Sequence, residues 1–117
     1  KALVVDDNLL NAKLLTAFLK KLDCSVDIAQ NGKQAFDKTN QASYDICFMD
    51  IQMPVMDGIE ATQKIRKHIS QDLPIIAVTA ISDFTQEKSL GTGMNDFMRK
   101  PVDFTLLKDI LHKYCLK

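Results

Sequence analysis

Short apolar runs alternate along the chain with longer stretches whose apolar residues recur at helical spacing. The runs predict five short strands, over residues 2–5, 25–29, 44–50, 75–78 and 95–98. The stretches between and after them predict five helices, over residues 9–22, 33–40, 59–69, 84–90 and 104–114. The first and fourth runs are almost entirely apolar, which is typical of strands buried on both faces.

Regular alternation of strands and helices favours an α/β fold with a parallel sheet covered by helices on both faces. The 117 residues fit one domain with one core, spanning 1–117. Because the chain begins at Lys1 without a methionine, inside a predicted strand, we take it as a piece cut from a longer protein.

The first predicted helix has the strongest apolar face. On a helical wheel six residues share one broad side, which we expect to be buried: Leu10, Leu14, Leu15, Phe18, Leu19 and Leu22. Leu9 falls among the polar residues, so we expect it to be exposed.

The composition argues against some classes of function. Lysine plus arginine equals aspartate plus glutamate, 15 each, so the net charge of zero argues against nucleic-acid binding through bulk charge. No apolar run approaches the roughly 20 residues of a membrane helix, so we expect no membrane contact by this domain. The three cysteines are odd in number and lack CxxC spacing, which predicts free thiols and a cytoplasmic location.

Polar residues gather where the predicted strands end. Asp6 and Asp7 follow the first strand, Asp50 ends the third, Thr79 follows the fourth and Lys100 follows the fifth. The carboxyl ends of parallel strands share one edge of the sheet, where ligands bind in open α/β folds. We therefore expect Asp6, Asp7 and Asp50 to converge, with Lys100 and Thr79 on the same edge.

Three carboxylates in one cleft repel one another unless a cation lies among them, and an all-oxygen set suits Mg²⁺. Carboxylates, a divalent metal, a lysine and a hydroxyl are the parts of a phosphoryl-transfer site, in which a carboxylate can be the nucleophile. Taken alone, each residue has an ordinary interpretation, such as a helix cap, a turn or a solvated lysine. Their combination at successive strand ends favours the site.

With these motifs the chain resembles a response-regulator receiver domain over its whole length. The matching pieces are Asp6-Asp7-Asn8, the stretch Met49 to Gly58, Thr79-Ala80 and Lys100-Pro101. The motifs are most similar to those of receivers in hybrid sensor histidine kinases. The resemblance implies a flavodoxin-like (βα)5 fold, doubly wound, with strand order 2-1-3-4-5.

The resemblance also implies roles in a two-component phosphorelay. Asp50 would accept a phosphoryl group from a phosphohistidine, and Thr79 and Lys100 would contact the phosphoryl oxygens. Mg²⁺, or Mn²⁺ in its place, would bind Asp7, Asp50 and the backbone carbonyl of Gln52, with Asp6 acting mostly through water.

Two further surfaces follow from the resemblance. Phe97 would be the switch aromatic. The fourth helix, fifth strand and fifth helix would form an output face for an output domain or a second copy, with residues Phe84, Thr85, Lys88, Met94, Phe97 and Lys108. Asn8, Leu9 and Asn11 would dock the histidine kinase or histidine phosphotransfer domain.

Alternatives remain at this stage. The chain could be a stand-alone response regulator, or one whose output domain was removed. A haloacid-dehalogenase-type phosphatase would need a second aspartate where Gln52 stands. A flavodoxin would need a phosphate-binding loop where Asp6 and Asp7 stand. A degenerate receiver that works only by binding would not need the complete acidic set. As a receiver, the domain would catalyse only its own phosphorylation and dephosphorylation.

Overall fold

The computed structural model describes residues 1–51, 53, 56–80, 91–100 and 102–115 of the chain. Its strands are β1 (Ala2–Val5), β2 (Val26–Ala29), β3 (Ile46–Asp50), β4 (Ile75–Thr79) and β5 (Asp96–Arg99). Its helices are α1 (Leu9–Lys21), α2 (Gly32–Gln41), α3 (Gly58–His68) and α5 (Phe104–Tyr114). The helix expected over 84–90 lies outside the described residues.

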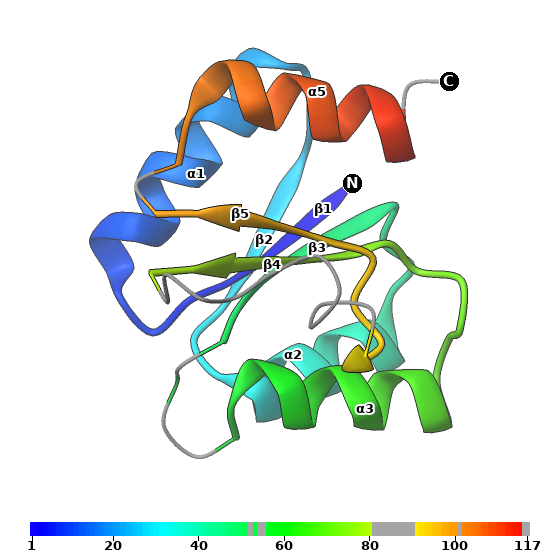
Figure 1. Cartoon of the computed structure of the whole chain (residues 1–117). Helices are drawn as coiled ribbons and strands as arrows, with labels where there is room; N and C mark the ends of the chain where they lie inside the picture. Colours follow the sequence, from blue (N-terminus) through cyan, green and yellow to red (C-terminus); the bar gives the residue numbers. More distant parts are fainter. Residues whose placement is uncertain (52, 54–55, 81–90, 101, 116–117) are drawn as a thin grey trace.

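The five strands form one parallel sheet in the order β2-β1-β3-β4-β5, which confirms the predicted fold class and strand order (Figure 1). β1 pairs with both β2 and β3, and β4 joins β3 to β5. All residues of β1, β3 and β4 are buried. This burial is the reason why their sequences are nearly continuous in apolar residues.

The helices cover both faces of the sheet, and each face has its own apolar cluster. Figure 1 shows α1 and α5 on one face and α2 and α3 on the other. Leu15 and Leu19 of α1 join Leu107 and Leu111 of α5 in one cluster. Ala35 of α2 joins residues of α3 in the other. The alternation of strand side chains between two faces makes both clusters possible.

The predicted buried face of α1 was too broad. Leu15 and Leu19 are buried, but Leu10 is 76% exposed and Leu14 is 44% exposed. The buried stripe is completed by Ala12, whose small side chain lets α1 approach the sheet. Leu9 is exposed as expected.

Each described helix begins after an asparagine or aspartate N-cap. Asn8, Asn31, Asp57 and Asp103 are N-caps whose side chains accept hydrogen bonds from backbone N–H groups of the first turn. Such caps satisfy donors that the helix itself leaves unpaired. In the described part of the chain no helix has the combined length and apolar character of a membrane span.

Candidate functional site

The three aspartates predicted to converge do so at the carboxyl edge of the sheet. Asp6 and Asp7 follow β1, and Asp50 is the last residue of β3, the strand beside it. Each offers a carboxylate oxygen within 4.8 Å of those of the other two. Asp6 and Asp50 are buried and Asp7 is exposed, so the cluster has one side open to solvent.

Lys100 supplies the cation that this cluster needs in the folded chain. Its ammonium Nζ lies 3.4 Å from Asp6 Oδ2 and 3.3 Å from Asp50 Oδ2. The Lys100 side chain is 22% exposed, so its interaction with the two buried carboxylates is less screened than that of a surface pair. The Lys100 backbone N–H donates to Thr79 O at 2.8 Å, which fixes the lysine at the end of β4.

Thr79 and Phe97 lie on the neighbouring strands β4 and β5, and Phe97 pairs with Ala77, two residues before Thr79. Thr79 ends β4 one residue beyond Val78, which pairs with Asp50, and it is buried. Phe97 is half-buried and packs against the apolar cluster under α2 and α3. The Arg99 guanidinium carbon lies 5.5 Å from the Phe97 ring centroid, a cation–π contact.

The turn after β1 orients Asp6. The Asn8 N–H donates to Asp6 Oδ1 at 2.8 Å, while Asn8 Oδ1 accepts from the Asn11 N–H at 3.1 Å and caps α1. Asp6 therefore offers Oδ1 to the backbone and Oδ2 to Lys100. This arrangement leaves Asp7, which is more exposed, facing solvent for a ligand.

Gly58 lets the start of α3 lie close to the end of β3. Gly58 donates its N–H to Ile51 O at 2.9 Å, and a Cβ added at Gly58 would lie 2.0 Å from Asp50 O. Only glycine fits this approach. The predicted metal ligand in the loop after β3, the Gln52 carbonyl, lies outside the described residues, as does Pro101.

The donor set fits a magnesium ion. Three carboxylates supply hard oxygen ligands, and the open side of the cluster leaves room for the waters that Mg²⁺ retains. Asp7 and Asp50 would hold the ion, with Asp6 beside them, already engaged by Lys100 and the Asn8 N–H.

An apolar surface lies beside the cluster, at the start of α1. Asn8 and Leu9 are exposed and Asn11 is half-buried, and their role in docking stays a prediction. Leu10 and Leu14 extend this surface along α1. Sequence reasoning missed both because their helical period resembles that of core residues.

The expected output face is only partly described. Lys108 is exposed, but Met94 is 1% exposed, so its expected place on this surface was wrong. Met94 precedes β5 and packs into the apolar cluster under α3. Phe84, Thr85 and Lys88 lie outside the described residues.

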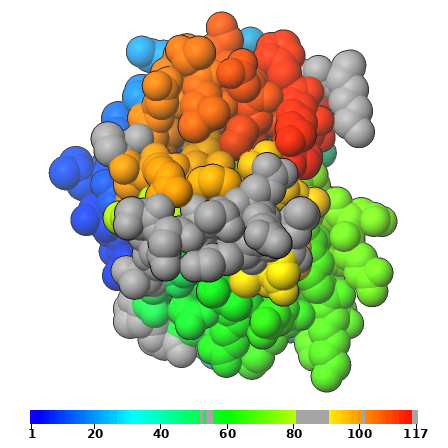
Figure 2. Space-filling model, in the orientation of Figure 1, coloured from blue at the N-terminus to red at the C-terminus, as the bar shows by residue number. Residues whose placement is uncertain are grey.

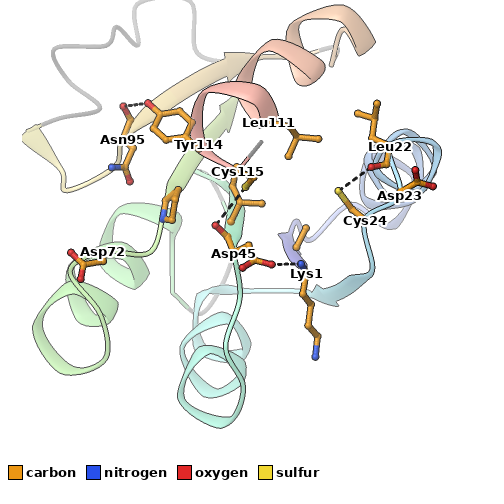
Figure 3. Close-up of a pocket in the computed structure, with 13 residues that line it drawn as sticks. Lys1, Leu22, Asp23, Cys24, Asp45, Asp72, Asn95, Leu111, Tyr114 and Cys115 are labelled. Atoms are coloured by element: carbon orange, nitrogen blue, oxygen red, sulfur yellow. Dashed lines mark hydrogen bonds and ion pairs between the residues drawn. The ribbon is translucent and has the colours of Figure 1, made fainter. Parts of the chain in front are cut away.

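A hollow of about 870 Å³, drawn in Figure 3, lies away from the acidic cluster. Its walls include Lys1, Asp45, Asn95, Tyr114 and Cys115, which lie toward the amino ends of the strands. A small hollow of about 50 Å³ reaches Asp6 and Lys100. We place the site at the acidic cluster and at neither hollow, because the charges of the three aspartates and Lys100 converge there.

The cysteines and histidines carry no metal site in the described part of the chain. Cys24, Cys47 and Cys115 are free thiols, as predicted. Burial raises the pKa of the Cys47 thiol to about 12. Both histidines, His68 and His112, are exposed.

Comparison with known proteins agrees with this geometry. Residues 2–112 match the family model "Response regulator receiver domain". The chain is 41% identical over 121 residues to hybrid signal transduction histidine kinase A of Dictyostelium discoideum. That alignment covers 97% of this chain and 6% of the relative, so the chain spans a small part of its length.

Two solved structures are similar. The receiver domain of sensor histidine kinase PA1611 from Pseudomonas aeruginosa PAO1, with magnesium coordinated in its active-site cleft, has a TM-score of 0.90 and 35% identity, covering 99% of this chain and 97% of that one. The second is a co-crystal structure of the Saccharomyces cerevisiae histidine phosphotransfer protein Ypd1 with the receiver domain of Ssk1. Its TM-score is 0.85 at 34% identity, and the match covers 97% of this chain and 86% of that one. The chain thus belongs to the response regulator receiver domain family, a family of signal-transduction domains.

Proposed function

We propose that Asp50 accepts a phosphoryl group from a phosphohistidine and that the domain thereby passes a signal in a phosphorelay. One observation carries this proposal. The Asp50 carboxylate ends a buried strand, 3.3 Å from the Lys100 ammonium and within 4.8 Å of two further carboxylates. A buried nucleophile beside a fixed cation and a set of metal ligands is suited to phosphoryl transfer.

In the transfer, an Asp50 oxygen forms a bond to phosphorus while the bond between phosphorus and the histidine nitrogen breaks. The histidine nitrogen keeps the bonding pair and takes up a proton. Lys100 moves its ion pair from the Asp50 carboxylate to a phosphoryl oxygen, and the Thr79 hydroxyl donates to another. Both residues therefore stabilise charge that develops on the transferred group.

Asp7 and Asp50 would hold Mg²⁺, with the Gln52 carbonyl as a further ligand and Asp6 acting through water; Mn²⁺ would substitute. When bound, the metal neutralises charge on the phosphoryl oxygens. The hydrogen bond from the Asn8 N–H to Asp6 Oδ1 would hold the turn after β1 in place while the metal binds.

The phosphoryl group would change the packing next to the site. It adds roughly −1.5 to −2 charge beside Thr79 and attracts its hydroxyl. Thr79 then leaves space that Phe97 can fill, and β5 with α5 would present a changed output face to an output domain or a second copy. Phe97 has no hydroxyl, so this switch would rest on burial of the ring.

The donor would be a histidine kinase or a histidine phosphotransfer domain that docks on the start of α1. Asn8, Leu9 and Asn11 lie beside the acidic cluster, and the exposed Leu10 and Leu14 add apolar area. The parent protein would be a hybrid sensor histidine kinase, with this domain on the cytoplasmic side. The similarity to hybrid kinases supports both proposals.

Incubation with acetyl phosphate and Mg²⁺ tests the function, with intact mass as the readout. We expect the mass of one phosphoryl group to be added to the parent chain and to the control Asp109→Ala, an exposed residue of α5. We expect no addition to Asp50→Ala. An equal adduct on Asp50→Ala, or no Mg²⁺-dependent adduct on the parent chain, would reject the proposal.

A further inference from the structure

Arg66 makes a set of hydrogen bonds that nothing in the phosphoryl chemistry requires. It lies in the last turn of α3 and is half-buried. Its Nε donates to Gly93 O at 2.8 Å, Nη1 donates to Leu73 O at 2.7 Å, and Nη2 donates to Asn95 Oδ1 at 2.7 Å. One planar guanidinium therefore joins α3 to the segment before β4 and to the segment before β5.

Asn95, which accepts from Arg66, also bonds to β4 and α5. Its Oδ1 also accepts from the Ile75 N–H at 2.9 Å, at the start of β4. Its backbone O accepts from the Tyr114 hydroxyl of α5 at 3.1 Å, a bond drawn in Figure 3. The Asn95 N–H donates to Ile75 O at 2.8 Å. α3, β4 and α5 thus meet at the residue that precedes β5.

The segment before β5 is shaped to reach Arg66. Figure 1 shows this yellow segment running from α3 up to the strand, and Figure 2 shows yellow atoms between the green of α3 and the orange of α5. Gly93 has φ +94°, and a Cβ there would lie 3.4 Å from Arg66 Cγ. A left-handed glycine lets the carbonyl of residue 93 face the guanidinium.

β5 carries Phe97, and the residue after it is Lys100. The strand is at the edge of the sheet and pairs only with β4 among the strands, so its register depends on few backbone contacts. A slip of one residue would move every side chain to the opposite face. Lys100 lies five residues beyond Asn95, about 16 Å away along an extended chain at ~3.3 Å per residue. Because β5 joins the two residues, a shift of Asn95 along the strand would also shift Lys100.

We propose that Arg66 is a positioning residue, which holds β5 in register through Gly93 and Asn95 and so places Lys100 between Asp6 and Asp50. This role rests on the proposed function of Asp50. Lysine cannot replace arginine here, because an ammonium is a point donor and cannot serve three acceptors in one plane.

The test compares Arg66→Lys with Val26→Ala, which removes apolar area from β2 at the other edge of the sheet. Both variants lower the melting temperature, and all assays run well below it. For Arg66→Lys we expect a roughly tenfold slower phosphorylation by acetyl phosphate, because displaced catalytic groups lose rate steeply. The half-saturating Mg²⁺ concentration should fall and not rise, because the aspartates stay in place on β1 and β3 while a displaced Lys100 competes less with the metal for Asp6 and Asp50. Val26→Ala should keep the parent rate.

Amide hydrogen exchange gives a second readout that does not depend on phosphorylation. In Arg66→Lys the N–H of Lys100, bonded to Thr79 O, should exchange roughly tenfold faster relative to amides of β1. Val26→Ala should leave this ratio unchanged. Parent-like rate and exchange in Arg66→Lys would overturn the inference. Absence of an Asp50 adduct in the parent chain would instead reject the proposed function, and the exchange ratio would still decide the role of Arg66.

Discussion

At the scale of single residues, Lys100 has two relations to the acidic cluster. It neutralises Asp6 and Asp50 in the folded chain, and it occupies the position from which it can contact a phosphoryl group. A metal ion bound at the cluster would therefore compete with Lys100 for the same carboxylates, while under the proposed function the two would together stabilise a transferred group. Replacing the lysine separates these two effects.

Lys100→Met should bind Mg²⁺ a few times more tightly, because a competing cation is gone, and should be phosphorylated about 100-fold more slowly. Mg²⁺ titration and intact-mass kinetics with acetyl phosphate measure the two effects. Lys67→Met, which changes an exposed lysine of α3, is the control and should match the parent chain. Slower phosphorylation combined with weaker Mg²⁺ binding would contradict this account.

The exposed leucines of α1 should act on the protein donor alone. Leu10→Ala should slow transfer from a phosphorylated histidine phosphotransfer domain by about tenfold, since truncating an apolar interface anchor costs more than 1 kcal/mol. Phosphorylation by acetyl phosphate should not change. Leu106→Ala removes a similarly exposed leucine from α5 and serves as the control. Equal slowing with both donors would place Leu10 outside the docking surface.

The acidic residues could be predicted from sequence because each follows a recognisable strand. Strand ends meet at one edge by topology alone, so Asp6, Asp50 and Lys100 required no contact information. Arg66 could not be found in this way. A helical arginine that donates to loop residues has the same sequence context as one in solvent, and the acceptors of Arg66 include two backbone carbonyls and the Asn95 side chain, which no sequence pattern marks.

At the scale of elements, the close approach between the end of β3 and the first turn of α3 depends on Gly58. Gly58→Ala should lower the free energy of unfolding by about 2–4 kcal/mol, because its Cβ would overlap Asp50 O and the backbone must shift. Urea unfolding measures the loss. At Gly91 an added Cβ meets nothing within 4 Å, so Gly91→Ala should be close to neutral. Similar losses in both variants would refute the steric explanation.

Helix α5 offers a matched pair of adjacent leucines. Leu107 is fully buried and Leu106 is 42% exposed. Leu107→Ala should cost about 2–5 kcal/mol by opening a cavity, and Leu106→Ala should cost below about 1 kcal/mol. Thermal or urea unfolding of the two variants tests the assignment of faces. A larger loss for Leu106→Ala would mean that α5 is rotated about its axis.

Periodicity predicted the elements better than it predicted their buried faces. The bounds of α5 agree with the prediction, as do those of β1. For α1 the apolar period was read as a wide buried face, although leucines at its margin are exposed. A helical wheel shows the direction in which a side chain leaves the helix axis. It does not show how wide a strip of the helix contacts the sheet, and in α1 that strip is narrower than the apolar face. Met94 shows the reverse error, since a residue between elements can be a core residue.

At the scale of the whole molecule, the core should exclude thiol-alkylating reagents as well as water. Cys47 lies in the central strand β3 with no exposed surface, and burial raises its pKa to about 12. At pH 8 its thiolate fraction would be roughly one in ten thousand even if a reagent could reach it.

Alkylation of the native protein should therefore modify Cys24 and Cys115, and Cys47 only after global unfolding. Burial raises the pKa of Cys24 and Cys115 as well, so their reaction should be slower than that of a free thiol. Peptide mapping after timed iodoacetamide treatment measures each site, and urea above the unfolding midpoint should expose all three. Modification of Cys47 at the rate of Cys24 would show that the sheet opens locally.

The hollow at the amino ends of the strands has a consequence for protein architecture. Lys1 and Cys115 both border it, so the two ends of the domain come together on one side of the molecule. The acidic cluster, where we propose phosphorylation, lies at the opposite edge of the sheet. A polypeptide attached at either end would leave from that side and would not cross the reactive surface. Such a fold can therefore be inserted into a longer chain while the acidic cluster stays accessible to solvent.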